Sequence, residues 1–316
     1  MSRASKAEKK AAKKNAATIN DQYDESSRQL TDEEAHRNVS YELPSFGTQV
    51  RQCFKVQMKR YTRQRIMWVC VILLALMPVI YLGLKTAKLL LPDTQVANIY
   101  MATLLCFGAA IIPLLSAIAC GATLSQELNE RTVFLSLPLP MSRSAFYLGK
   151  FLAGLLLIEG TISAAYGIAI IISMLETTSM FTSMIFESFI LALTFGLFCC
   201  AISYAMSTKL KRGSTMLPFI VVFIILPVIG IVVSGYSGIE FLESLCKYIP
   251  TYEMDMAINS LGNTAAISVT GIASAMFFGL SMVTYSDNNM AVAAVSVIIS
   301  IVLLYAGYIV IKRRDM

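Results

Sequence analysis

The sequence predicts an all-α membrane protein with six transmembrane helices, and three observations lead to this fold class. Of the 316 residues, 56% are hydrophobic and only 15% are charged, whereas a soluble domain carries about 25% charged residues. Six apolar runs are each long enough to cross a bilayer, which takes about 17–25 helical residues. Basic residues cluster beside these runs. The net charge of +6 therefore indicates span orientation and contact with anionic lipid, and no nucleic-acid partner is expected.

Residues 1–43 form a polar tail that we expect to be disordered and cytoplasmic. A basic block at 3–14 is free to lie on anionic lipid, and an acidic block at 21–34 follows it. His36, the sole histidine of the sequence, lies in this tail. A histidine-dependent metal site in the membrane is therefore excluded, and no metal site is expected.

Residues 44–65 predict a basic amphipathic helix that lies in the membrane interface. Apolar side chains recur at spacings of three and four, and six basic residues occupy other positions. The apolar positions are Phe46, Val50, Phe54, Met58 and Tyr61. Trp68 follows at the depth expected of an interfacial aromatic anchor.

The expected spans form a transmembrane domain over 66–316 and can be oriented by their flanking charges. They lie at 66–84, 99–123, 151–175, 184–206, 216–234 and 290–311. Most flanking basic residues fall on one side of this topology, and only Lys85, Lys88 and Lys247 fall on the other. The positive-inside rule then places both termini in the cytoplasm, as in a multi-pass protein of the cell membrane. Pro78, Pro113, Pro218 and Pro227 mark expected kinks.

Residues 235–289 predict a long extracytoplasmic region between the last two spans. Within it, 265–283 is moderately apolar and could be a seventh span. A seventh crossing would put Lys312, Arg313 and Arg314 outside, and the Gly, Ser and Thr content of the segment weakens its tendency to insert. We therefore expect an amphipathic or re-entrant helix at this position.

The loop between the second and third spans combines charge, proline and helix signals. Leu124, Leu128 and Leu135 share one side of a short helix. Glu127 and Arg131, four residues apart with the acid first, form a favourable surface pair. Pro138 and Pro140 end that helix, and Ser142 is a candidate N-cap for the next one. The pattern predicts a helix–turn–helix projection on the cytoplasmic side.

This loop resembles that of ABC transporter permeases of the ABC-2 exporter type. The matching residues, in order, are Ser125, Glu127, Thr132, the Leu135–Pro138 block, the pair Ser142 and Arg143, and the pair Gly149 and Lys150. Two departures are Arg131 in place of the family's usual glycine and a longer interval after Pro138. The break at 248–251 and the basic ending at 308–315 are also similar to this family, so the resemblance extends from about residue 46 to the end.

The resemblance implies the permease subunit of an ATP-driven exporter. It further implies an interfacial elbow helix at 44–65, a cytoplasmic coupling helix at 124–135, a separate ABC ATPase subunit and a second copy of this or a related permease. The residues expected at the ATPase contact are Glu127, Arg131, Thr132, Pro138 and Arg143. ATP and Mg²⁺ would be bound by the ATPase and not by this chain, because Gly149 and Lys150 lack the rest of a phosphate-binding loop.

Glu159 is the acid of greatest interest within the spans, since it lies about 13 Å beyond Lys150 at helical rise. An ionised carboxylate at such depth is costly and usually faces a cavity or a partner. A substrate contact, proton coupling or gating are functional alternatives to a protonated Glu159 that only packs. Small residues nearby, from Gly149 and Gly154 to Gly160 and Gly167, suit either a dimer seam or packing within one chain.

Two other function classes remain as alternatives. The first is a secondary transporter that uses Glu159 as its proton site. The second is an intramembrane enzyme, but the spans hold no histidine and no aspartate, which excludes metal-dependent and aspartyl types. The chain is therefore expected to be a transport subunit without enzymatic activity of its own. The sequence does not identify the substrate.

Overall fold

The structure, a computed structural model, is helical in every segment that it describes. The described residues are 44–65, 68–69, 71–72, 76, 79, 83, 108–122, 124–125, 142–176, 184–209, 216–229, 248–261 and 288–313. No strand occurs among them. These helices belong to one compact unit, Ser45–Met316. The all-α prediction is confirmed for this part of the chain.

Ten helical elements follow one another along the described residues. They are α3 (Phe46–Tyr61), α6 (Gly108–Ser116), the π-helical turn η1 (Ala117–Gly121), α9 (Arg143–Glu176), α10 (Met184–Ser207), α11 (Leu217–Ile220), the π-helical turn η3 (Val221–Ile225), the 3₁₀ turn η4 (Pro250–Tyr252), α14 (Glu253–Asn259) and α16 (Asn289–Arg313).

Three of these helices, α9, α10 and α16, are long and apolar enough to cross a membrane. They coincide with the third, fourth and sixth predicted spans, and α10 does so to within one residue. Shorter apolar helices, Ile111–Gly121 and Leu217–Ile229, lie within the second and fifth predicted spans. Most of the first predicted span lies outside the described residues, so the count of six stays a prediction.

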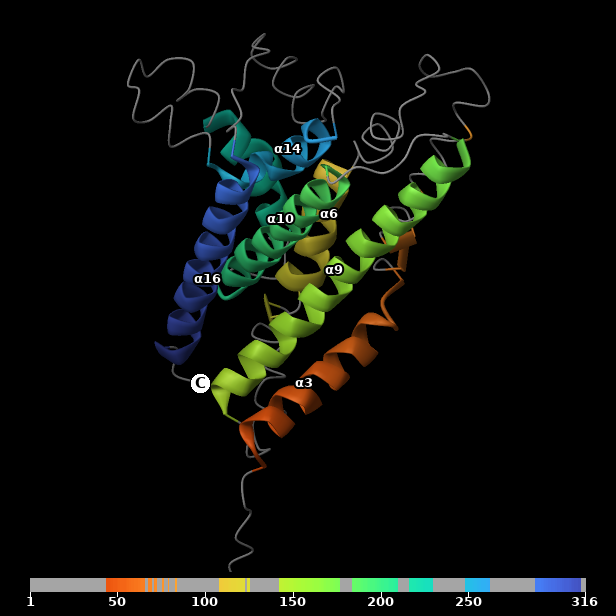
Figure 1. The fold of residues 1–316 in the computed structure, drawn as a ribbon. Coiled ribbons are helices and arrows are strands. Elements are labelled where there is room, and N and C mark those ends of the chain that lie inside the picture. The colour runs from red at the N-terminus through yellow and green to blue at the C-terminus, as the bar shows by residue number, and fades with distance from the viewer. Residues whose placement is uncertain are drawn as a thin grey trace, which may run out of the picture. The chain divides into compact units, whose positions relative to one another are not determined.

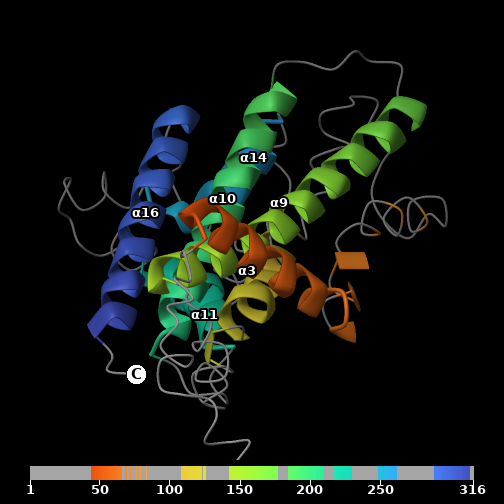
Figure 2. The ribbon, with the colours of Figure 1, turned by 90° about the horizontal axis from the view of Figure 1, so that it is seen from below.

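Helix α10 is the central element of the described unit. It packs against α9 on one side and α16 on another, and it also contacts α6, η1 and α14 (Figure 1). Helix α3 lies along α9, as the view in Figure 2 also shows. The short helix α14 lies near the end of α16 that is opposite the C-terminus (Figure 1).

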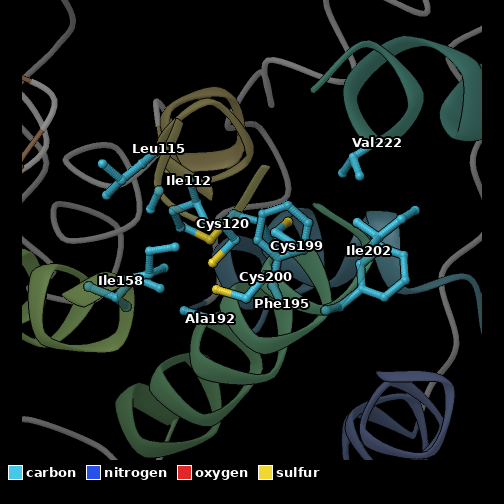
Figure 3. Close-up of a cluster of buried hydrophobic side chains, with 14 of the residues drawn as sticks. Ile112, Leu115, Cys120, Ile158, Ala192, Phe195, Cys199, Cys200, Ile202 and Val222 are labelled. Carbon is cyan, nitrogen blue, oxygen red and sulfur yellow. The ribbon is translucent and has the colours of Figure 1, made fainter. Parts of the chain in front are cut away.

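The hydrophobic core surrounds α10, where α6, η1, α9 and α11 meet it (Figure 3). Ile112, Leu115, Ile158 and Phe195 are among its largest fully buried side chains. The thiols of Cys120, Cys199 and Cys200 are buried in the same cluster and are not in disulfides. They serve as small apolar side chains, as expected of cysteines within apolar runs.

Both π-helical turns follow a proline. Pro113 lies inside α6 and η1 begins four residues later, while Pro218 lies at the start of α11 and η3 begins three residues later. Proline lacks an N–H group and its ring clashes with the turn before it, whereas both π-turns lie after a proline. The kinks expected at Pro113 and Pro218 stay predictions.

Residues 46–61 do form a helix, and one stripe of its side chains is buried by the rest of the protein. The buried side chains of α3 are Gln49, Cys53, Gln57 and Tyr61, at spacings of four. Phe46, which belongs to the predicted apolar face, is 51% exposed. Helix α3 packs on α9, and Gln49 finds a hydrogen-bond partner there in Ser142. The interfacial location of this helix stays a prediction.

Candidate functional site

The first residues of α9 are fixed by a polar contact with α3. Ser142 caps the helix, since the backbone N–H of Ala145 donates to its Oγ at 3.3 Å. The predicted N-cap is therefore confirmed. The side-chain carbonyl oxygen of Gln49 accepts hydrogen bonds from the N–H of Ser142, at 2.9 Å, and from its Oγ, at 3.0 Å. Helix α3 thus holds the residue at which the chain leaves the predicted coupling loop.

Helices α3 and α9 are also in van der Waals contact, at Gly149. A Cβ added there would lie 2.6 Å from the Cβ of Cys53 and 2.8 Å from the carbonyl oxygen of Val50. The neighbouring Lys150 is only 6% exposed, and its Nζ lies 3.9 Å from the centre of the Phe146 ring. Lys150 is thus buried where α3 approaches α9.

The far end of α3 is attached to η1. The hydroxyl of Tyr61 donates a hydrogen bond to the carbonyl oxygen of Ala119, at 2.9 Å, and both residues are buried. Gly154 of α9 completes this junction, because a Cβ added to it would lie 2.5 Å from Cys120 Sγ and 3.3 Å from the hydroxyl oxygen of Tyr61. Helix α3 therefore contacts both the second and the third predicted spans.

Aromatic side chains join the three long helices, α9, α10 and α16, near the start of α9. Tyr204 of α10 donates to the carbonyl oxygen of Tyr147 at 2.8 Å, and Tyr147 of α9 donates to that of Leu304 in α16 at 3.1 Å. Arg143 also reaches α16, where its Nη1 lies 3.4 Å from the carbonyl oxygen of Lys312. A guanidinium group at a helix C-terminus is favourably placed. A displacement at the start of α9 would therefore act on all three helices.

Glu159 lies in the middle of α9 and faces α10. A Cβ added to Gly196 would lie 3.1 Å from its Oε1. Its Oε2 is buried and has no hydrogen-bond partner among the described residues. The side chain also lines an apolar groove between α3 and α9, together with Val50, Phe54 and Leu152. Such a carboxyl group can hold a proton or form a hydrogen bond with a polar molecule that enters the groove.

The structure places only some of the residues predicted to have a function. Glu127, Arg131, Thr132 and Pro138 lie outside the described residues, so their proposed contact with an ATPase stays a prediction. Arg143 and Glu159 are described, and they lie in different parts of α9, Arg143 at its start and Glu159 near its middle. No group of three or more potential metal ligands occurs in the described part of the chain.

The sequence pattern missed three functional candidates. Gln49 and Tyr61 make the contacts of α3, but a hydrophobic pattern ranks glutamine as exposed and treats Tyr61 as one more apolar position. The third, Glu253 of α14, is completely buried. The sequence offered one indication of this site, which is that an acidic residue stands three positions after Pro250.

The comparison with protein families agrees with this architecture. Residues 53–316 match the family model described as ABC-2 family transporter protein. Among proteins of curated function, none matches the sequence. The matched range includes every described helix except the first turns of α3.

Proposed function

The chain belongs to the ABC-2 family of transporter proteins as an ABC-2 type permease, and from this premise we propose that it is the membrane-spanning subunit of an ATP-driven exporter. A separate ATPase subunit would supply the energy, and a second copy or a related permease would complete the translocation path. The observation that carries the proposal is the family match over most of a multi-pass membrane chain.

The contacts around α9 suggest how movement would enter the permease. The ATPase would dock on the predicted coupling helix at 124–135, on the cytoplasmic side. Closure of the ATPase on nucleotide would then displace Ser142, which Gln49 ties to α3. Because Tyr61 joins α3 to η1, the displacement would reach the second and third spans together. The spans would exchange inward-open and outward-open packings by a shift in populations.

The proposal is tested by isolating the complex from gently solubilised membranes. Tagged wild-type chain should recover an ATPase subunit, and the double variant Glu127→Ala/Arg131→Ala should recover much less of it. A matched control is Glu243→Ala/Lys247→Ala, which removes an acid–base pair of the same spacing from the predicted extracytoplasmic region. The control should recover as much ATPase as wild type.

Two results would change the proposal. If wild type recovers no nucleotide-hydrolysing partner in several detergents, the ATP-driven mechanism is wrong, and a proton-coupled transporter centred on Glu159 takes its place. If both double variants lose the ATPase equally, the loop is not the specific contact. Transport of a substrate by reconstituted permease alone, driven by a pH gradient and abolished by Glu159→Gln, would favour the alternative directly.

A further inference from the structure

A completely buried carboxyl group lies where α14 meets two of the long helices. Glu253 is the first residue of α14 and is 0% exposed. Helix α14 packs against α10 and α16, and it also contacts α6 and η4. Glu253 lies beside Thr194 and Ser296, which are about 15 Å and about 10 Å from the first residues of their helices at helical rise. Its carboxyl group is therefore inside the bundle and not at its end.

The hydrogen bonds around Glu253 fit a protonated carboxyl group. Ser296 Oγ lies 3.1 Å from Glu253 Oε2 and 3.5 Å from the carbonyl oxygen of Thr194. A hydroxyl group has one proton and can donate to only one of these acceptors. If Glu253 is protonated at Oε2, it donates to Ser296, and Ser296 donates to Thr194. The proton of Glu253 and the hydroxyl proton of Ser296 then each have an acceptor.

An ionised Glu253 would leave this site poorly satisfied. A carboxylate needs donors at both oxygens, yet Oε1 is buried and has no hydrogen-bond partner among the described residues. The hydroxyl of Thr194 bonds to carbonyl oxygens of its own helix, those of Ile190 and Leu191. Burying a charge without such compensation is costly. The geometry thus favours the neutral acid in the packed state of α14.

We propose that Glu253 is a proton-binding site, and that the bound proton holds α14 against α10 and α16. Loss of the proton would leave a charge in an apolar environment, and the least costly response is for α14 to withdraw until water reaches the carboxylate. Helix α14 is then an element whose packing on the bundle depends on one proton. This inference does not depend on ATP-driven export, because it concerns the packing of this chain alone.

The ionisable groups near Glu253 are few among the described side chains. Cys199 of α10 interacts electrostatically with both Glu253 and Glu159. Asp255 lies two positions after Glu253 on α14 and is 2% exposed. Residues two positions apart lie on different faces of a helix, so Asp255 does not share the face of Glu253. Helix α16 presents the hydroxyl of Ser296, η4 contributes the buried hydroxyl of Thr251, and α6 contains no ionisable residue. Burial raises the pKa of Glu253 to about 9, and its hydrogen bond with Ser296 opposes that shift.

Glu159 provides a matched control, because it approaches α10 at Gly196, two residues from Thr194. Infrared difference spectra of the full-length protein in lipid nanodiscs would follow the carbonyl stretch of protonated carboxyl groups from about pH 6 to about pH 10. Glu253→Gln should lose less protonated carboxyl signal in this range than wild type does, and the component that it lacks should still be lost in Glu159→Gln. An identical change in Glu253→Gln and wild type would overturn the proton site.

Cysteine labelling tests whether the proton controls packing. Ala257 is buried on α14, so Ala257→Cys reports withdrawal of the helix when its labelled peptide is quantified by mass spectrometry. At each pH, the labelling rate is compared with that of Ala257→Cys/Glu253→Gln, which cancels the pH dependence of thiol reactivity. The ratio should be near one at about pH 6 and should rise several-fold above about pH 9. A constant ratio, or rapid labelling of the Gln variant at low pH, would refute control by the proton.

Discussion

Tyr61 on α3 donates a hydrogen bond to the carbonyl oxygen of Ala119, 2.9 Å away and inside the π-helical turn η1. A π-turn disturbs the regular pairing of backbone groups along a helix, and a buried carbonyl group needs a donor. Tyr61 provides that donor from another helix. The irregular part of the second predicted span is therefore stabilised by α3.

Replacing Tyr61 with phenylalanine should destabilise the protein by about 0.5–1.5 kcal/mol, because the ring stays while the buried hydrogen bond from its hydroxyl to Ala119 is lost. The measurement is the unfolding midpoint of purified protein in detergent. Tyr305→Phe is the matched control, since Tyr305 is 64% exposed and should lose nothing measurable. Equal midpoints for Tyr61→Phe and wild type would show that the hydrogen bond does not stabilise the fold.

Gly149→Ala should destabilise the packing of α3 on α9. The new Cβ would meet the backbone carbonyl of Val50 at 2.8 Å, and a backbone atom cannot move aside as a flexible side chain can. Overpacking of this kind costs about 1–3 kcal/mol. Gly160→Ala is the control, because nothing described lies within 4 Å of its added Cβ. The prediction fails if the two variants unfold at the same denaturant concentration.

Gln49→Ala should weaken the transfer of movement from the coupling loop to α3, because it removes both hydrogen bonds to Ser142. In the reconstituted complex we expect ATP hydrolysis to continue while transport per ATP falls several-fold. Gln52→Ala offers a control on the same helix, since Gln52 is exposed. Loss of hydrolysis and transport in equal proportion would instead indicate that Gln49 only stabilises the assembly.

Composition was sufficient to predict the long helices, for a physical reason. A run of apolar residues that spans a bilayer must satisfy its backbone internally, so it becomes a helix whatever its neighbours are. Helices α9, α10 and α16 follow this rule, and the N-cap at Ser142 was predicted by local chemistry alone. The sequence also singled out Glu159, and the structure places its carboxyl group between helices, where one oxygen has no hydrogen-bond partner among the described residues.

The contacts between helices could not be predicted in this way. The apolar pattern of α3 did not indicate which of its side chains other helices bury, and these include Gln49 and Gln57. Nor does the pattern indicate that Lys150 is buried beside Gly149, where α3 approaches α9. The burial of Glu253 depends on three elements meeting, and no local pattern encodes that.

The buried state of Glu253 also predicts how stability depends on pH. Burial raises the pKa of its carboxyl group from 4.5 to about 9 in the folded protein. Between these values the folded chain keeps a proton that the unfolded chain has lost, so stability falls as pH rises. The contribution is fully present below about pH 4.5 and is lost progressively as pH rises towards about 9.

Thermal unfolding between about pH 6 and about pH 9 should therefore separate wild type from Glu253→Gln. The midpoint of wild type should decline with pH more steeply than that of the Gln variant, whose side chain stays neutral throughout. Glu187→Gln is the matched control, because Glu187 lies in the first turn of α10 and is only partly buried. It should retain the steep decline of wild type. Parallel curves for wild type and Glu253→Gln would mean that Glu253 binds its proton no more tightly in the folded chain than in the unfolded one.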